Sequence, residues 1–277
     1  MGTHLEQYRA KLAKMAETAA SEEVTGSNFF TTQGGVLKYA DEELPGNEMV
    51  VVIVDSIHEN TYYTGTFDPD NILPPKCFAF GRTAKEMEPH TNVPGPDDKG
   101  ADDSYFEMQA EWCDECPHNE WGSAEVGRGK ACSSRRRLAV IPAGRFTQTG
   151  KRKSETELQI FTDVSHFKDA DIAFLKIPVT STKAYSKYVQ MLNKDHQCPP
   201  FGVLTHIFLE PHKDHNFEIG FEMVEVIEDT DILEALFARN QEAGEVIEQP
   251  YNEPTDEELE KPKASEKRGI KGLRKKK

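Results

Sequence analysis

Residues 49–57 read MVVVIVDSI, a run of apolar residues that is interrupted only by Asp55 and Ser56. Short runs rich in Val and Ile, bounded by turn residues, are typical of β-strands. Because this run is so apolar, we predict that it forms a central strand of a sheet. The turn sequence ELPGNE (43–48) separates it from a second predicted strand, VLKYA (36–40).

The same signals predict strands in much of the remaining chain. They fall at RLAVIPA (137–143), ELQIFTDV (157–164), AFLKIPV (173–179), FGVLTHIFL (201–209) and FEIGFEMVEVI (217–227), with the last two forming a hairpin. Helical spacing of apolar residues predicts helices at 4–19, 181–196 and 231–243. Residues 61–82 are expected to form an ordered loop, and the Pro- and Asp-rich residues 83–107 a flexible excursion.

This order of elements predicts a mainly β (α+β) fold. The natural candidate is an OB-like antiparallel barrel with an inserted zinc-binding module and flanking helices. We divide the chain into an N-terminal helix and linker (1–27), an OB-like domain (28–227) with the insertion at about 77–136, and a C-terminal helix and disordered tail (228–277). The two parts of the tail have opposite charge. Residues 228–260 hold twelve Asp or Glu against one Arg, whereas residues 261–277 hold nine Lys or Arg against one Glu.

Length and composition are those of a folded protein with loose ends. The chain has 277 residues, of which 37% are hydrophobic and 29% charged. No stretch approaches the roughly 18 apolar residues of a membrane-spanning helix, and no apolar signal-peptide core is seen, so we expect a soluble, non-secreted, cytoplasmic protein with no membrane partner. The net charge of −15 means that any polyanion must meet a local basic patch.

The five cysteines predict a metal site. A reducing cytosol and an odd number of cysteines favour metal binding over a disulfide framework. Cys113 and Cys116 have the Cys-x2-Cys spacing of a zinc knuckle, Cys132 is the third expected ligand, and Cys77 is chosen as the fourth. His118 and His90 are alternative fourth ligands, an iron–sulfur cluster uses the same residue types, and free thiols are the remaining alternative. Cys198 is interpreted as a small buried side chain.

Positive charge is concentrated beside these cysteines, because residues 127–153 hold nine Lys or Arg and no Asp or Glu. Such segregation is typical of a surface that meets a phosphate backbone. The predicted phosphate contacts are Arg128, Lys130, Arg135, Arg136, Arg137, Arg145, Lys151, Arg152 and Lys153.

Aromatic residues near this segment are candidates for stacking on unpaired bases, which a duplex does not expose. The four that we assign to stacking are Trp121, Tyr62, Tyr63 and Phe146. The alternative is that most of these rings belong to the core.

Several segments together resemble a poorly characterised family of tailed-bacteriophage proteins over roughly residues 28–227. They are FFTTQGGVLKYADEE, PPKCFAFG, WCDECPHNEWGSA, GRGKACSSRRRLAVIPA and PPFGVLTHIFLEP. More loosely, the organisation is similar to phage helix-destabilising proteins, which combine an OB-fold, sometimes a zinc subdomain, and an acidic C-terminal tail. The basic last 17 residues and the cysteine spacing depart from that pattern. The resemblance implies a protein of the infected host cell.

These observations predict a single-stranded DNA-binding protein of phage replication or recombination, with a structural zinc ion and no enzymatic activity. The tail is a candidate site for replication or recombination proteins. GRGKAC does not match the phosphate-loop pattern. Two alternatives stay open. One is a zinc-organised protein-interaction module. The other is a metal-dependent nuclease, whose carboxylates would come from the acidic segment that holds Asp55, His58, Glu59, Asp68 and Asp70. His206, His212, His215, Glu210 and Asp214 are interpreted as a solvated turn.

Overall fold

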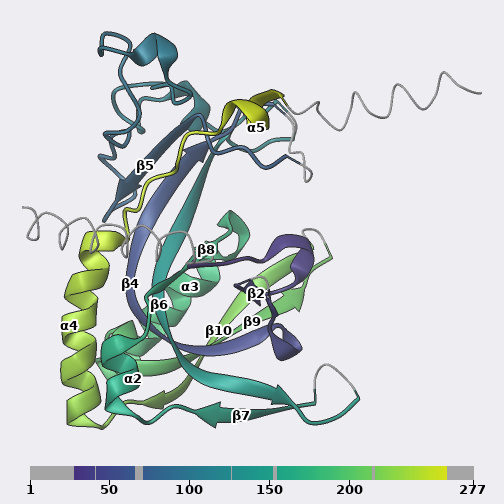
Figure 1. Cartoon of the computed structure of the whole chain (residues 1–277), viewed down its shortest axis with the longest axis vertical. Coiled ribbons are helices and arrows are strands. Elements are labelled where there is room, and N and C mark those ends of the chain that lie inside the picture. Colours follow the sequence, from purple (N-terminus) through teal and green to yellow (C-terminus); the bar gives the residue numbers. More distant parts are fainter. Residues whose placement is uncertain are drawn as a thin grey trace, which may run out of the picture.

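The computed structural model describes residues 28–40, 42–65, 71–125, 127–151, 155–213 and 216–260. The helix predicted at 4–19, the residues Arg152 and Lys153, and the basic segment 261–277 lie outside these ranges. Figure 1 shows a twisted sheet with helices packed beside its lower half and a lobe of loops at its upper end.

Ten strands and four α-helices are described. The strands are β1 (Phe29–Phe30), β2 (Lys38–Tyr39), β3 (Glu42–Glu43), β4 (Glu48–Tyr62), β5 (Cys77–Gly81), β6 (Cys132–Gln148), β7 (Thr156–Ile160), β8 (Ala173–Ile177), β9 (Val203–Pro211) and β10 (Phe217–Val226). The helices are α2 (Val164–Asp169), α3 (Val179–Met191), α4 (Thr230–Val246) and α5 (Asp256–Glu260), with a π-helical turn at Leu192–His196. Short 3-10 turns occur at Gln33–Gly35, Pro45–Asn47, Ala101–Asp103, Pro117–Asn119 and Pro200–Gly202.

The predicted central strand is confirmed and lies in the middle of the main sheet. Along β4, Val50, Val52 and Val54 enter one hydrophobic core, which α2 and α4 cover. Their neighbours Met49, Val51 and Ile53 enter a second core, which α3 covers on the opposite face. A strand that is buried on both faces needs an apolar side chain at every position, and this is the reason for the continuous run.

The sheet is open, so the predicted OB-like barrel is not found in the described residues. The strand order is β1-β8-β6-β4-β9-β10, with β5 added to β4 and β7 to β6. All pairs are antiparallel except β1 with β8, and the end strands β1 and β10 do not pair with each other. A barrel turns one face of its sheet inward, whereas here helices cover both faces. The coarser prediction of a mainly β, α+β fold is confirmed.

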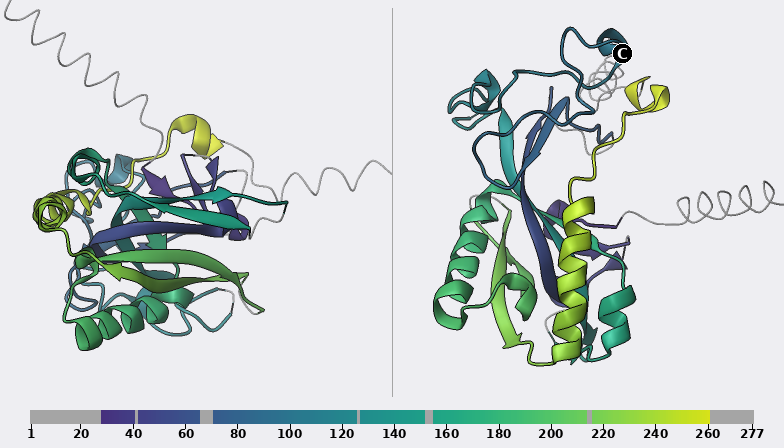
Figure 2. Two further views of the ribbon diagram at one scale, coloured as in Figure 1. Left: turned by 90° about the horizontal axis from the view of Figure 1, so that it is seen from below. Right: turned by 90° about the vertical axis from the view of Figure 1, so that its left-hand side faces the viewer.

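The long strands β4 and β6 continue beyond the helices and carry the upper lobe. A register shift between Ile53 and Asp55 adds one residue to β4, so that Ile57 returns to the core that holds Val54. From there, odd-numbered residues of β4 face the α4 side and even-numbered residues face the α3 side. We use these two faces, the α4 face and the α3 face, to place the functional residues (Figure 2).

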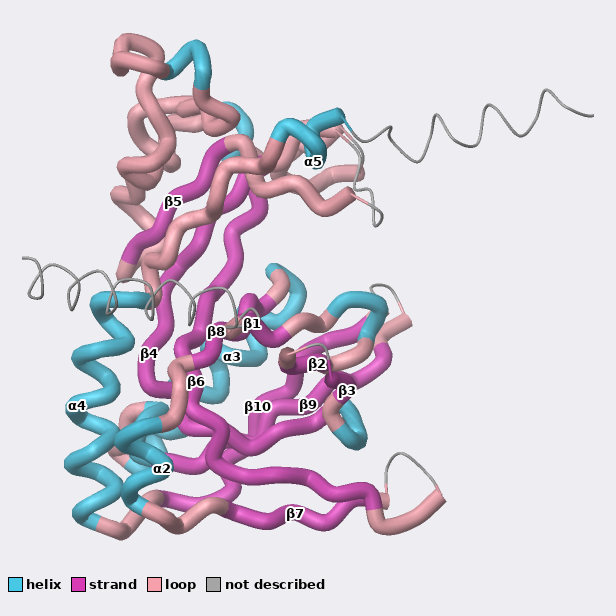
Figure 3. The backbone as a smooth tube through the Cα atoms, viewed as in Figure 1, coloured by secondary structure: helices cyan, strands magenta, loops and turns pink. Residues whose placement is uncertain are grey.

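Residues 82–131 together with the adjoining ends of β4, β5 and β6 form the cysteine lobe, which is largely loop (Figure 3). Two predictions are corrected here. The loop predicted at 61–82 contains β5, which pairs with β4 from His58 to Tyr62. The excursion predicted to be flexible, 83–107, packs against the lobe, because Met87, Val93 and Phe106 are only 2–3% exposed.

The acidic C-terminal segment is also folded as far as Glu260, which corrects the predicted disordered tail. Helix α4 belongs to the body and buries Ile232 and Leu236 against the sheet. Residues 248–260, here named the strap, then run up to the lobe (Figure 1). Glu253 Oε1 accepts hydrogen bonds from Ser104 Oγ and from the Tyr105 amide. Because it makes these contacts, the strap is part of the fold.

Most of the other predicted elements agree with the structure, but the strand predicted at 157–164 ends at Ile160, and Val164 begins helix α2, which was not predicted. The helix at 181–196 corresponds to α3 and its π-helical turn, and the last predicted helix corresponds to α4. Strands β9 and β10 form the expected hairpin. Among the helices of the described residues, none is both long and apolar enough to span a membrane.

Candidate metal centre and nucleic-acid interface

Three strands end side by side at the base of the cysteine lobe. Tyr62, at the end of β4, pairs with Cys77, which begins β5, and on its other side with Cys132, which begins β6. Residues that are opposite one another in a sheet share a face, so the side chains of all three project on the α3 face. Pairing in the sheet therefore brings together two cysteines that are 55 positions apart in the chain.

The other two predicted ligands come from a turn above these strand ends. The Cys113 amide donates to the Met87 carbonyl (2.8 Å), and the Cys116 amide donates to the Cys113 carbonyl (3.4 Å). Asn119 Nδ2 donates to the Cys113 carbonyl at 2.8 Å. The turn is thus closed locally by hydrogen bonds before any ligand is considered.

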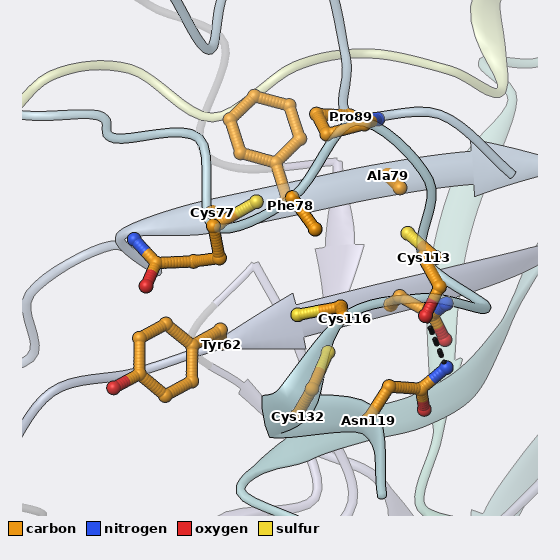
Figure 4. Close-up of a pocket in the computed structure, with 12 residues that line it drawn as sticks. Tyr62, Cys77, Phe78, Ala79, Pro89, Cys113, Cys116, Asn119 and Cys132 are labelled. Atoms are coloured by element: carbon orange, nitrogen blue, oxygen red, sulfur yellow. Dashed lines mark hydrogen bonds between the residues drawn. The ribbon is translucent and has the colours of Figure 1, made fainter. Parts of the chain in front are cut away.

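All four predicted cysteines line one small cavity, with Tyr62 at its edge (Figure 4). The cavity has a volume of about 20 Å³, comparable to the space that one water molecule or one ion requires. The four cysteines are 8–9% exposed, and none is in a disulfide. In the part of the chain that the structure describes, no three His, Cys, Asp or Glu side chains already have the spacing of a metal site. The sulfurs are therefore neighbours but do not yet converge on one point.

The surroundings of the thiols disfavour thiolates when no cation is present. Burial, together with the nearby Cys113 and Cys116, raises the pKa of Cys77 to about 11. Burial and the other three cysteines raise the pKa of Cys132 to about 12. Burial likewise raises the pKa of Cys113, although a hydrogen bond from Asn60 opposes the shift. A divalent cation would reverse this preference, because it stabilises several thiolates at once.

Neither alternative histidine ligand lines the cavity. The His118 ring stacks on Tyr62 with a centroid separation of 4.0 Å. The His90 ring stacks on Phe78 at 5.2 Å, and its Nδ1 accepts a hydrogen bond from the Asn92 amide. Of the three candidates for the fourth ligand, Cys77 alone is placed among the other cysteines. Cys198 lies elsewhere, half-buried beside the core that α3 covers.

The loop between Cys116 and Cys132 presents an exposed tryptophan beside basic residues. Trp121 is 79% exposed. The next residue, Gly122, donates its amide to the Gly129 carbonyl (3.0 Å), so the backbone of Trp121 lies near that of Arg128 and Lys130. The Lys130 ammonium itself donates to Asn119 Oδ1 at 3.0 Å. Gly122 and Gly127 have φ angles of 91° and 90°, so these two turns require glycine. The glycines thus bring the chain back toward Cys132, as the sequence predicts.

The three consecutive arginines do not line one groove, because successive residues of β6 point to opposite faces. Arg136 lies on the α3 face, where its guanidinium contacts Ser56 Oγ and His58 Nε2. Arg135 and Arg137 lie on the α4 face. Arg135 is half-buried and contributes to the electrostatic environment of Tyr63. The single positive groove that we predicted is therefore divided between two faces.

The prediction that Arg137 contacts phosphates is wrong, because its side chain is 1% exposed. It donates at 2.6 Å to Glu59 Oε1, which is itself fully buried, and to the carbonyls of Ile247 (3.1 Å) and Gln249 (2.6 Å). Burial would raise the pKa of Glu59, but Lys176 and Arg137 outweigh it and lower that pKa. Arg137 therefore fixes the start of the strap to the sheet.

Two residues that sequence reasoning missed complete this buried cluster. Tyr251 donates its hydroxyl to Glu59 Oε1 at 2.6 Å and accepts from Lys176 Nζ at 2.8 Å. Lys176 lies in the strand predicted at 173–179, opposite Arg137 in the pairing of β6 with β8. Lys176, a charged residue within the otherwise apolar segment AFLKIPV, was the available signal for a buried acidic partner, but the sequence does not say which carboxylate supplies it.

The remaining basic residues lie far from the lobe. Arg145 and Lys151 are exposed at the β7 end of β6. Arg145 follows Arg135 by ten positions along β6, a separation of up to roughly 33 Å. Phe146, predicted to stack on bases, is half-buried against the core beneath α4 and contacts the His206 ring. These residues and the lobe do not form one site.

The two predicted tyrosines have different roles. Tyr62 is half-buried and covered by the His118 ring. Tyr63 is 39% exposed and lies on the α4 face near Tyr251. Neither shares the open position of Trp121.

The acidic residues considered for a nuclease do not form a cluster where the structure describes them. Asp55 accepts from Arg82 Nη1 through both oxygens at 2.7 Å. Glu59 accepts a hydrogen bond from Arg137, and His58 contacts Arg136. Asp68 and Asp70 lie outside the described residues, as do Asp214 and His215 of the predicted solvated turn. In that hairpin His206 instead contacts Glu48 Oε2 at 3.0 Å.

Comparison with known proteins gives no relative: no protein-family model, no curated protein and no solved structure matches this chain. The functional argument therefore depends on the geometry of the site.

Proposed function

We propose that the chain is a single-stranded DNA-binding protein with little sequence preference, in which a structural zinc ion holds the cysteine lobe. Its role would be in phage DNA replication or recombination, a context that rests on the sequence resemblance alone. The observation that carries the proposal is the loop bounded by Cys116 and Cys132, which exposes Trp121 and carries Arg128 and Lys130 on the segment that its backbone pairs with.

The four cysteines fit zinc by number, type and location. Structural zinc sites use four tetrahedral ligands, and four thiolates are a common set. The cavity is small and free of competing carboxylates. Metal binding would draw the sulfurs together through rotamer changes and a small closure of the turn that carries Cys113 and Cys116. It would thereby fix both ends of the Trp121 loop.

The exposed loop has the two components that single-strand binding needs. An accessible indole offers a stacking platform for bases, and adjacent cations attract the phosphate backbone. Because every base has a π-face and every nucleotide a phosphate, such contacts carry little sequence information. Arg136 is a further candidate contact, since it lies on the same face as the cysteines.

We expect neutralisation of Arg128 and Lys130 to weaken binding of labelled oligo-dT. Each phosphate contact on a single strand contributes about 0.7 to the slope of log K against log salt, so Arg128→Gln with Lys130→Gln should reduce the slope by about 1.4. Trp121→Ala should cost roughly 1–3 kcal/mol of binding free energy if it stacks on one base. Fluorescence anisotropy across a salt series measures both, with a duplex of equal length as the comparison.

The matched control removes the same charge from the other end of β6. Arg145→Gln with Lys151→Gln should leave the affinity and its salt dependence nearly unchanged. If this double variant reduces the slope of log K against log salt and the double variant of Arg128 and Lys130 does not, DNA binds at the β7 end and the proposed interface is misplaced. If the protein contains zinc but binds no oligo-dT at any salt concentration, the lobe is a protein-docking surface instead.

A further inference from the structure

A cleft on the α4 face has no role in the proposed function. It has a volume of about 660 Å³ and is bounded by the C-terminal half of α4, the turn between α2 and β8, and Asn28. Its lining includes the carboxylates of Asp169, Asp171, Glu242, Glu245 and Glu248, all on exposed residues. The size is within the range of ligand sites, but the charge is unusual for one.

Most of this negative charge has no counter-charge in the fold. Arg239 pairs with Glu242 at 2.7 Å and also donates to the Ala170 carbonyl. Burial lowers the pKa of His90, the other basic residue of the cleft, although Glu248 opposes the shift, and this favours the neutral form of the ring. Among the described residues, no ion pair is formed by the remaining carboxylates, which are Asp169, Asp171, Glu245 and Glu248. Four carboxylates around one concave surface attract a polycation.

We propose that this cleft binds the chain's own basic C-terminal segment, residues 261–277. That segment holds nine Lys or Arg against one Glu. It also contains Ile270 and Leu273, which suit the apolar part of the cleft formed by Ile172, Phe174 and Val246. The charge and the mixed lining are thus complementary to this segment.

The length of the chain allows this contact. The cleft includes Pro250, and the basic segment begins eleven residues later, at most roughly 37 Å away if extended. Its 17 residues span up to roughly 58 Å, which is enough to return along the strap. Tethering also gives the segment a high effective concentration at the cleft.

The N-terminal segment is a poorer occupant, although it enters the fold at Asn28 beside the cleft. Residues 1–27 carry three Lys or Arg against four Glu, so their charge does not complement the carboxylates. Binding of the C-terminal segment has a functional consequence. The most basic part of the chain would be held on the face opposite the cysteines, where it could neither join nor obstruct the lobe.

Zero-length carbodiimide cross-linking of the full-length protein tests this directly, because it joins lysine amines to carboxylates in contact. With ¹⁴N and ¹⁵N chains mixed at 50 mM salt, we expect amide links from the lysines of 261–277 to Glu245 and Glu248 within one label. Raising the salt to 0.5 M should reduce them at least fivefold, since screening shortens the range of the attraction. No nucleic acid or metal is needed, so the result is independent of the proposed function.

Glu234 is the internal control, because it is exposed on α4 but outside the cleft. Glu245→Gln with Glu248→Gln should also reduce links to Asp169 and Asp171, whereas Glu234→Gln should not. Equal linking of the tail to Glu234 and to the cleft would overturn the proposal. So would links between labels, which indicate a second copy, or links from Lys11 and Lys14, which indicate the N-terminal segment.

Discussion

Replacement of Cys113 by serine is expected to abolish zinc binding and to unfold the cysteine lobe while the body of the sheet remains folded. The hydroxyl is a poor zinc ligand, and a structural site with three thiolates loses most of its affinity. Metal analysis should fall from about one zinc per chain to near zero. The lobe should respond because residues 82–131 contain few strand hydrogen bonds and depend on a small core around Phe78 and Phe106.

The two tryptophans make this result measurable region by region. Both Trp112 and Trp121 lie in the lobe, and the chain has no others. Tryptophan emission therefore reports the lobe alone, whereas far-UV circular dichroism reports mainly the body. Because Trp121 is already 79% exposed, the change in emission of the Cys113→Ser protein should come from half-buried Trp112, which becomes solvated while the circular dichroism stays nearly unchanged.

Cys198→Ser is the matched control, because this fifth cysteine lies outside the cavity. It should retain full metal content. Comparison of Cys77→Ser with His118→Ala identifies the fourth ligand. Because Cys77 lines the cavity and His118 does not, we expect only Cys77→Ser to lose zinc. If Cys113→Ser binds as much zinc as the unmodified chain, the metal site has been assigned to the wrong residues.

The parts of the fold that the sequence predicts are those set by local pattern. The apolar run at 49–57, the hairpin of β9 and β10, and helix α4 follow from periodicity and turn residues, and all three are present. The gathering of four cysteines at one cavity was anticipated from spacing alone for Cys113 and Cys116. For Cys77 and Cys132 it depends on their common pairing with Tyr62, which no local pattern encodes.

The failures come from long-range pairing and from strand alternation. An open sheet and a barrel can use the same order of strands, and the choice depends on which helices cover which face. The three arginines were treated as one patch, although the period of two in a strand sends Arg136 to one face and its neighbours to the other. The strap escaped prediction because its composition is that of a disordered tail, although Tyr251 and the Gln249 carbonyl attach it to the buried cluster around Arg137 and Glu59.

Arg137 is consequently the residue whose loss should most destabilise the body. A buried ion pair contributes little relative to a well-packed apolar pair, but removal of one partner leaves an uncompensated charge. Here Glu59 would remain at 0% exposure, with Lys176 Nζ 3.8 Å away and only partly buried. The carbonyls of Ile247 and Gln249 would also lose their donor.

We therefore expect Arg137→Met to lower the free energy of unfolding by about 3–5 kcal/mol, as measured by urea denaturation with far-UV circular dichroism. Arg135→Met, on the same strand and face, should cost less than about 1 kcal/mol. Adding Glu59→Leu to Arg137→Met should recover part of the loss, because the fully buried carboxylate is then removed as well and only the partly exposed Lys176 remains charged.

The pH dependence supplies a second test of the same cause. In the unmodified chain, the pKa of Glu59 is lower in the folded state than in the unfolded state. This difference stabilises the fold at pH values above the unfolded-state pKa, and the stabilisation is lost as the pH falls through the folded-state pKa. Without Arg137, burial is opposed by Lys176 and the Tyr251 hydroxyl alone, so the pKa of Glu59 is higher than in the unmodified chain and acidification destabilises the variant less. The stability gap between the two proteins should therefore be widest near neutral pH and should narrow as the pH is lowered. A gap that stays constant with pH would mean that Arg137 acts through packing, and that the charge of Glu59 is not what it compensates.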